Sequence, residues 1–506
     1  MSFSSAIPVV DIFAGPGGLG EGFSAFVPRR SSKVTPFKIA VSAEMEPNAA
    51  KTLRLRAFFR QFSAGLAPDS YYEYVAGRAN SPWTESTKVE WRAACEEARQ
   101  LTLGNAEHDA LLHARIRTVA KGNQPWVLIG GPPCQAYSLV GRSRNQGIVG
   151  YKAEDDHRHF LYTHYLKIVR EFRPAAFVME NVKGILSSKV DGALMFPKIL
   201  EDLRAPGGKR GPRYQIVPLV VCSNGVPDEL DGRRYVLRAE ELGVPQARHR
   251  VVLLGLAEGI DPSRGKFLKP TEDRFSVDEA IAGLPKLRSG PTDAQVEAWP
   301  VTAAELLATA GALSEDEKVA KLLVKLSKRV PKRDPGSGGK QVPKSHLSDQ
   351  VPEHLKDWFL DPRLDVILNH EVRQHMAGDL LRYAYASAFA SVHWRSPRGA
   401  IEFPLGLHPN HENWNSGKFI DRFKVQLANA PSSTVTSHLS KDGHYFIHPD
   451  PSQMRSLSVR EAARLQTFPD NYFFEGARGA QFRQVGNAVP PWMARQIASV
   501  VYSLLS

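Results

Sequence analysis

Cysteine is scarce in this sequence. Only three occur in 506 residues, Cys95, Cys134 and Cys222, and their spacing is not that of metal ligands. This argues against a disulfide framework or a zinc site and suits a reducing compartment. Long apolar runs are also lacking, since none approaches the ~20 residues that span a bilayer. The amino terminus has no basic region or cleavage site of a signal peptide, so we expect a cytoplasmic protein that uses neither membrane nor metal.

Acidic residues are too few to balance the basic ones. Lys and Arg total 65 against 53 Asp and Glu, a net charge of +12, which favours a polyanionic partner. Part of the excess lies in residues 321–344, where Lys and Arg stand beside Gly, Ser and Pro. Such a loop is suited to phosphate contacts, although a solvated linker has the same composition. A chain of this length should form two or more domains.

The stretch 126–138, W-V-L-I-G-G-P-P-C-Q-A-Y-S, places one cysteine at an abrupt turn. Its four apolar residues predict a buried strand that ends at the Gly-Gly-Pro-Pro sequence. Cys134 therefore stands at the carboxyl end of the strand, where open α/β sheets bind their ligands. A thiol in that place is positioned like a nucleophile, although most free cysteines are buried and inert.

A glycine-rich turn near the amino terminus indicates a nucleoside-cofactor site. Strand 7–13 leads into A-G-P-G-G-L-G and then a helix, with the spacing G-x-G-x-x-G from Gly15 to Gly20. The missing side chains let a ligand approach the backbone, and the helix start offers unpaired N–H groups. A second strand, 37–42, leads to Glu44, whose carboxylate can accept hydrogen bonds from ribose hydroxyls.

Two further segments bring polar side chains to the same region. The strand A-A-F-V-M-E-N-V delivers Glu180 and Asn181 at its carboxyl end, which is the edge of Cys134 if both strands are parallel. The approach to a later buried strand reads Q-A-R-H-R, in which Arg248 and Arg250 alternate and so point to one side. There they can hold a carboxylate and a carbonyl oxygen, although a surface salt bridge would explain either arginine alone.

The remaining segments differ in pattern. Residues 46–123 are mainly helical and longer than one crossover requires, which indicates an insertion. From about 256 to 456 the alternation of strands and helices fails, and we expect a second domain. Within it the sequence L-N-H-E-V-R-Q-H-M offers two histidines but no third metal ligand at a recognisable spacing. Asp442-Gly443 predicts a hairpin, and after residue 456 the pattern is helical again.

Together these segments resemble the DNA (cytosine-5) methyltransferases. Six motifs follow the order of that family: D-I-F-A-G-P-G-G-L-G, G-G-P-P-C-Q-A-Y-S, E-N-V, Q-A-R-H-R, R-E-A-A-R-L-Q-T-F-P-D and Q-V-G-N-A-V-P-P. The resemblance implies an α/β fold, a doubly wound Rossmann-like domain formed by residues 1–255 with a helical insertion at about 50–123. Residues 457–506 would complete that domain, and residues 256–456 would form a smaller target-recognition domain.

By this resemblance the glycine-rich turn and its neighbours bind S-adenosylmethionine, which becomes S-adenosylhomocysteine, without a metal. Glu44 would bind the ribose, and Met45 would lie against adenine, where the family often has an aromatic residue. Asn487 and Ala488 would close the site. The other expected contacts are Phe13, Gly15, Gly17, Gly18, Leu19 and Pro132. No residue is assignable to the adenine amino group.

The reaction that the resemblance implies is methyl transfer to C5 of a cytosine flipped out of duplex DNA. Cys134 would add to C6, and because a free thiol of pKa about 8.5 is mostly protonated at neutral pH, positive charge should stabilise the thiolate. Glu180 would hold or protonate N3. Arg250, with Arg248 in the same catalytic set, would hold O2 and orient Glu180. The base that removes the C5 proton is not identifiable.

Three other functions are compatible with parts of the pattern. An NAD-dependent oxidoreductase would share the glycine turn and Glu44 but leaves P-P-C-Q, E-N-V and Q-x-R-x-R unexplained. An RNA cytosine methyltransferase does not need a second domain sized for reading a duplex. A silent DNA-binding relative does not need Cys134, Glu180 and Arg250 together. We therefore expect a monomeric, prokaryotic, nucleoid-associated enzyme that acts on double-stranded DNA beside cognate restriction or defence proteins.

Overall fold

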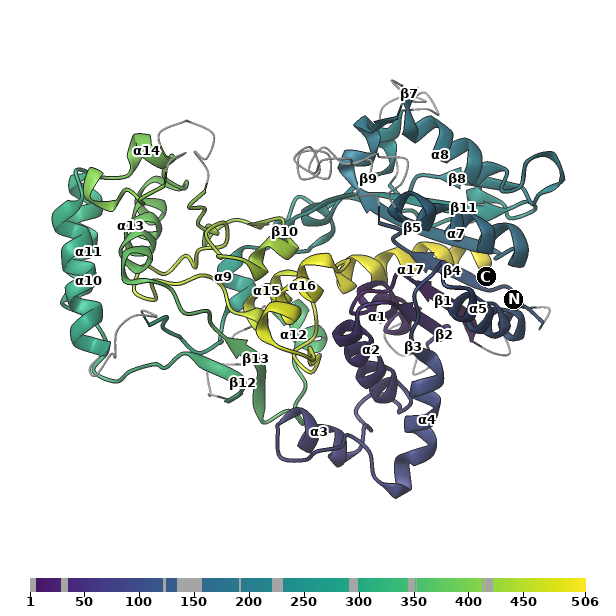
Figure 1. The fold of residues 1–506 in the computed structure, drawn as a ribbon, viewed down its shortest axis with the longest axis horizontal. Coiled ribbons are helices and arrows are strands. Elements are labelled where there is room, and N and C mark those ends of the chain that lie inside the picture. The colour runs from purple at the N-terminus through teal and green to yellow at the C-terminus, as the bar shows by residue number, and fades with distance from the viewer. Residues whose placement is uncertain are drawn as a thin grey trace.

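The fold is built on one eight-stranded sheet (Figure 1). A computed structural model describes residues 6–28, 35–121, 124–133, 157–190, 193–220, 231–290, 299–344, 351, 353–411, 414 and 422–506. The strands follow the spatial order β3-β2-β1-β4-β5-β11-β8, and β9 pairs with β11. Their bounds are β1 (Ile7–Ile12), β2 (Phe37–Glu44), β3 (Ala98–Gln100), β4 (Val127–Gly130), β5 (Ala176–Val182), β8 (Tyr214–Val217), β9 (Val236–Arg238) and β11 (His249–Ala257).

The strands from β3 to β5 run parallel, as expected for the edge that should hold Cys134 and Glu180. β11 runs antiparallel to β5, β8 and β9. The chain order reverses between β1 and β4, which is the point where open α/β sheets bind ligands. Because β11 is antiparallel, its amino-terminal end lies at the carboxyl end of β5. The Q-A-R-H-R sequence therefore reaches the ligand-binding edge.

Helices cover both faces of the sheet. On one face Val9, Val127 and Leu254 belong to a core with α1 and α17. On the other face the neighbouring strand residues Leu128 and Leu253 pack with α5, α7 and α8. Both faces are buried, which explains why the strands are nearly continuous apolar runs. The bounds are α1 (Gly18–Ser24), α5 (Ala106–Ala120), α7 (His157–Phe172), α8 (Met195–Arg204) and α17 (Pro491–Leu505). The predicted α/β, doubly wound fold is confirmed.

The segment between β2 and β4 is mainly helical, as predicted, but it also supplies a strand. Its further helices are α2 (Pro47–Arg60), α3 (Asp69–Val75) and α4 (Lys88–Glu97). The three-residue β3 extends the sheet in parallel beyond β2. Phe58 and Tyr71 belong to a separate core cluster in these helices. A strand this short has no detectable periodicity, so the sequence pattern alone indicated only helices.

The middle of the chain has a hydrophobic core of its own. Leu307 of α10, Leu323 of α11 and Tyr383 of α13 are among its fully buried residues. Figure 1 shows these helices as a lobe that α9, α15 and α16 separate from the sheet. The elements are α9 (Val277–Ile281), α10 (Trp299–Leu313), α11 (Glu317–Ser327), β12 (Gly338–Pro343), α12 (Glu353–Phe359), β13 (Val366–Glu371), α13 (Ala377–His393), α14 (Gly399–Glu402) and β14 (Ser432–Ser433).

The hairpin predicted around Asp442-Gly443 is wrong. Gly443 does turn the chain, with φ of 79°. However, the preceding residues form the 3-10 helix η11 (Ser437–Ser440), and β14 pairs in parallel with β10 (Gln246–Ala247). Pairing with a distant strand overrides the local turn signal.

The last part of the chain is helical, as predicted. α15 (Val459–Leu465) begins at a capping box, in which Ser458 Oγ accepts from the Glu461 N–H at 3.1 Å. α16 (Arg478–Asn487) precedes α17, which begins at Pro491. In the described parts of the chain, no helix is both long and apolar enough to cross a membrane. The short elements are β6 (Lys189–Val190), β7 (Ala193–Leu194), η1 (Glu85–Thr87), η3 (Lys183–Ser187), η4 (Gly208–Arg210), η5 (Gly232–Tyr235), η6 (Ala239–Leu242), η7 (Pro262–Arg264) and η9 (Leu405–Leu407).

Candidate active site

The turn after β1 has one open side and one tightly packed side. Gly15 and Gly17 have φ of 57° and 95°, a region that glycine adopts without steric cost. Among the described residues, no heavy atom comes within 4 Å of a Cβ built on Gly15. A Cβ on Gly18 would instead lie 2.1 Å from the Val489 carbonyl oxygen. Gly15 thus leaves room for a ligand, whereas Gly18 allows the turn to pack against the residues before α17.

Glu44, at the end of β2, is bound to this turn. Its Oε2 accepts from the Gly15 N–H and its Oε1 from the Glu46 N–H, both at 2.8 Å. Burial raises the pKa of Glu44, and these two hydrogen bonds oppose the rise. The next side chain, Met45, is 58% exposed. A carboxylate and an open apolar side chain therefore lie together beside the turn.

The other predicted cofactor residues differ in exposure. Phe13 is half-buried and has a positive φ of 55°, which is unusual for a bulky side chain. The Leu19 side chain is only 6% exposed and packs in the core, so only its backbone could reach a ligand. Asn487 is exposed at the end of α16, and Ala488 is buried directly before Val489.

Glu180 and Arg250 form an ion pair across neighbouring strands. In the antiparallel ladder Glu180 lies opposite Val252 and Arg250 opposite Val182, which makes the two charged residues diagonal neighbours on one face. Arg250 Nε lies 2.9 Å from Glu180 Oε1, and the side chains are only 11% and 14% exposed. Burial lowers the pKa of Arg250, and the charge of Glu180 opposes that shift.

The turn that precedes Cys134 lies against the same strand. Asn181 is buried and donates from Nδ2 to the Pro132 carbonyl oxygen at 3.0 Å. A Cβ on Gly131 would lie 3.0 Å from Glu180 Oε2, so the second carboxylate oxygen of Glu180 lies beside this turn. Cys134 itself lies outside the described residues. Asn181 was not among the residues expected to act, and its only sequence signal is its place next to Glu180 in E-N-V.

Arg248 has different partners from Arg250. Its side chain is buried and donates to the carbonyl oxygens of Val435, at 2.7 Å, and Gly486, at 3.2 Å. Burial holds the pKa of Arg248 well below its usual range. The guanidinium therefore connects α16 with the end of residues 256–456, which we call the middle segment. Its predicted catalytic role stays a prediction.

Gly15, Glu44, Glu180 and Arg250 lie at one edge of the sheet, on both sides of the strand-order reversal. The ends of β1 and β2 present an open glycine turn and a carboxylate, which suit a nucleoside. The ends of β4 and β5, with the start of β11, present a shielded carboxylate–guanidinium pair, which suits a polar ring. In the described ranges, no three His, Cys, Asp or Glu side chains are grouped to hold a metal ion.

The chain is similar to known methyltransferases over nearly all of its length. The family model of the C-5 cytosine-specific DNA methylases matches residues 105–503. The type II methyltransferase M.Bpa9945I of Bacillus paralicheniformis is 31% identical over 98% of this chain and 99% of that protein. M.AgeI of Thalassovita gelatinovora, also a type II methyltransferase, is 30% identical over 75% of this chain and 83% of its own.

A third relative is named for the reaction that it catalyses. The DNA (cytosine-5-)-methyltransferase M.ApeKI of Aeropyrum pernix is 27% identical over 75% of this chain and 81% of its own length. The family match accounts for the motifs that an NAD-dependent oxidoreductase leaves unexplained. It also confirms the resemblance to this family and covers five of the six sequence motifs, while the first motif, at residues 11–20, precedes the matched region. The chain therefore belongs to the C-5 cytosine-specific DNA methylase family and is a DNA (cytosine-5-)-methyltransferase.

Proposed function

We propose that this enzyme transfers a methyl group from S-adenosylmethionine to C5 of a cytosine that is flipped out of a specific duplex sequence. Family membership establishes C5 methylation of cytosine in DNA. The donor, the covalent mechanism and the residue roles are our proposal. The observation that supports them best is the shielded Glu180–Arg250 pair beside the turn that leads into Cys134.

The residues at the ends of β1 and β2 fit S-adenosylmethionine. The open side of Gly15 leaves room for the ligand, and each Glu44 oxygen keeps a lone pair for a ribose hydroxyl. The exposed Met45 side chain offers an apolar surface to adenine. The bound sulfonium supplies an electrophilic methyl group. Phe13, Gly17, Gly18, Leu19, Pro132, Asn487 and Ala488 would complete the site, Gly18 and Leu19 through the backbone.

The residues at the ends of β4 and β5 would activate cytosine. Cys134 would add its thiolate to C6, which makes C5 electron-rich, and positive charge at the site would favour the thiolate. Glu180 would hold a proton between N3 and its own oxygen that faces Gly131, so that N3 takes up this proton as Cys134 adds, while Arg250 holds the other Glu180 oxygen and the cytosine O2. After methylation a base removes the C5 proton, and the electrons of that bond expel Cys134 from C6.

We assign DNA recognition to residues 256–456. This part of the chain contains a separate core and an exposed basic stretch that includes Lys325, Lys328 and Lys332, which is suited to phosphates. Phosphate contacts would offset the few kcal/mol that base flipping costs. The enzyme would act as a monomer in the cytoplasm, on the double-stranded DNA of the nucleoid. Because two relatives are type II methyltransferases, we place it in a restriction–modification system with a cognate nuclease.

Methyl transfer from labelled S-adenosylmethionine to mixed-sequence duplex DNA tests this proposal. We expect the wild type to label one short sequence motif, and sequencing to locate the label as 5-methylcytosine. Cys134→Ala should abolish the label, whereas Cys95→Ala, which removes the thiol on α4, should retain it. Equal labelling by Cys134→Ala would refute the mechanism, and labelling of RNA alone would refute the substrate assignment.

A further inference from the structure

Helix α3 of the insertion is bonded to the loop between α12 and β13. Tyr72 donates from its hydroxyl to Asp361 Oδ2 at 2.8 Å. The Arg363 guanidinium lies 4.3 Å from the centre of the Tyr72 ring and 2.6 Å from Asp69 Oδ1. Arg363 also donates to the Ala67 carbonyl oxygen. One aromatic side chain and one guanidinium thus fasten the insertion to the middle segment.

The loop is bonded to the C-terminal segment at the same place. Asn471 donates from Nδ2 to Asp361 Oδ2 at 2.8 Å, so Tyr72 and Asn471 share one carboxylate oxygen. The Tyr71 hydroxyl donates to the Asn471 carbonyl oxygen at 2.9 Å. Arg56 of α2 donates to Asn471 Oδ1 at 3.0 Å. Three segments that are far apart in sequence therefore meet at Asp361 and Asn471. We call this meeting point, with Tyr72 and Arg363, the joint.

These bonds continue to the cofactor turn. Arg56 Nε donates to Glu21 Oε2 at 2.9 Å, and Glu21 lies in the first turn of α1. Both side chains are less than a tenth exposed. Tyr472, next to Asn471, donates from its hydroxyl to the Pro16 carbonyl oxygen. The insertion is therefore bonded to α1, directly after the glycine turn, and to the middle segment, while the C-terminal segment is bonded to the turn itself.

The loop that carries Asp361 and Arg363 leads into β13, and β13 pairs with the strand that follows the basic stretch. β13 pairs antiparallel with β12, and the residues before β12 carry Lys328 and Lys332. Gln341 of β12 donates to the Val75 carbonyl oxygen at 3.0 Å, so this strand is also bonded to α3. Fixing β12 and β13 fixes the point from which the basic stretch extends.

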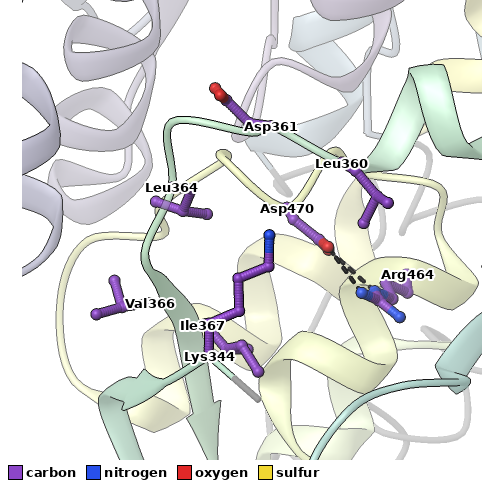
Figure 2. A pocket seen from close by; sticks show the side chains of 8 residues that line it. All are labelled: Lys344, Leu360, Asp361, Leu364, Val366, Ile367, Arg464 and Asp470. Atoms are coloured by element: carbon purple, nitrogen blue, oxygen red, sulfur yellow. Dashed lines mark hydrogen bonds and ion pairs between the residues drawn. The ribbon is translucent and has the colours of Figure 1, made fainter. Parts of the chain in front are cut away.

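The joint combines polar bonds with apolar packing, because Tyr71, Tyr72, Leu364, Leu368 and Phe473 belong to one buried cluster. A small hollow lies beside the joint, lined by Lys344, Leu360, Asp361, Leu364, Val366, Ile367, Arg464 and Asp470 (Figure 2). Figure 2 shows Arg464 paired with Asp470 on one wall and Asp361 directed away from the hollow. The apolar cluster is not directional, whereas the Tyr72 and Arg363 bonds are, so loss of these bonds should loosen the orientation of the joint even where the packing remains.

We propose that Tyr72 and Arg363 are positioning residues for DNA. They hold the middle segment at a fixed orientation to the cofactor turn, so that a duplex can contact both parts at once. If the joint is loose, DNA binding must first fix the orientation of the middle segment. The conformational entropy lost in that step weakens DNA binding. Cofactor binding depends on the sheet itself and does not carry this cost. The inference rests on the assignment of residues 256–456 to DNA recognition.

Steady-state kinetics of Tyr72→Phe and Arg363→Ala in the full chain test the proposal. We expect KM for duplex DNA to rise about 5–30-fold, while kcat and KM for S-adenosylmethionine stay within about twofold. Two matched controls remove the same groups elsewhere. Tyr214→Phe loses a bond to the Pro174 carbonyl oxygen, and Arg117→Ala loses a pair with Glu171 and a stack on Phe172. Both controls should keep the wild-type KM for DNA.

Two outcomes would overturn the positioning role. In one, folded Tyr72→Phe and Arg363→Ala keep the wild-type KM for DNA. In the other, both KM values and kcat worsen together with a lowered melting temperature, which indicates general destabilisation. Tyr72→Phe removes a single oxygen and keeps the test valid if Arg363→Ala does not fold. Failure of the wild type to methylate duplex DNA would refute the proposed function instead, so the two failures are distinguishable.

Discussion

Asn181 donates a hydrogen bond from its side-chain amide to the Pro132 carbonyl oxygen at 3.0 Å. The bond joins the end of β5 to the turn after β4, directly before Cys134. The other amide atom of Asn181, Oδ1, accepts from the Val182 N–H at 2.9 Å, so the side chain is held at both ends. One asparagine thus sets the position of the turn relative to Glu180.

Replacement of Asn181 by Ala should slow methyl transfer. The buried Pro132 carbonyl would lose its donor, at a cost of about 1–3 kcal/mol, and the turn could shift relative to Glu180. We expect a fall of about 10–100-fold in the single-turnover rate, with KM for S-adenosylmethionine unchanged. Asn105→Ala, which removes the cap of α5, should lower stability and leave the rate unchanged. A wild-type rate for Asn181→Ala would contradict this role.

Substitutions of Glu180 and of Arg250 should differ in their effects on the methyl-transfer rate and on the stability of the fold. Glu180→Gln keeps the shape of the side chain, and we expect the single-turnover rate to fall about 10²–10⁴-fold with little change in melting temperature. Arg250→Ala leaves the shielded carboxylate without its partner and should also lower the free energy of unfolding by about 3 kcal/mol. Arg117→Ala, which removes an exposed arginine, should lower the free energy of unfolding by less than about 1 kcal/mol. Activity of Glu180→Gln within threefold of wild type, on the order of 1 kcal/mol or less, would remove Glu180 from the mechanism.

Two glycines of the cofactor turn should respond differently to alanine. In Gly18→Ala the new Cβ would collide with the Val489 carbonyl oxygen, so the melting temperature should fall, corresponding to about 1–3 kcal/mol. In Gly15→Ala the space is open and only the positive φ costs about 1–2 kcal/mol, but the methyl group occupies the proposed ligand space. We therefore expect weaker S-adenosylmethionine binding by calorimetry for folded Gly15→Ala. Undiminished binding would place the cofactor elsewhere.

Acid should destabilise the fold through buried histidines. Burial lowers the pKa of His370 to about 4 and the pKa values of His375 and His448 to about 3. Below pH 6.5 the unfolded chain therefore takes up protons that the folded chain does not. Their stabilising contribution is complete above about pH 6.5 and declines as the pH falls towards 4.

Urea unfolding at two pH values measures this effect. We expect a loss of about 1 kcal/mol per histidine between pH 7 and pH 5.5. His375→Gln should reduce the loss by the share of one histidine, even though it removes the bond to Ser456 Oγ at 3.0 Å. An identical loss in this variant would show that His375 does not contribute.

Local patterns predicted the strands and turns at the edge of the sheet. The apolar runs that end at Gly15, at Gly131 and at Glu180 are strands in the structure, and their parallel pairing follows from the helices between them. The sequence did not reveal the direction of β11. Its antiparallel pairing with β5 places Arg250 at the ligand edge, and that pairing is not encoded in the Q-A-R-H-R sequence.

The sequence by itself determined the α/β fold class, the methyltransferase family and the edge at which Glu44 and Glu180 lie, because these follow from periodicity, turn residues and motif order. The tertiary structure alone decided the partners of Arg248 and Arg250. The two residues are chemically identical and two positions apart, yet one binds Glu180 and the other binds carbonyl oxygens 187 and 238 residues away. Such partners are brought together only by folding, so no local pattern could distinguish the two arginines.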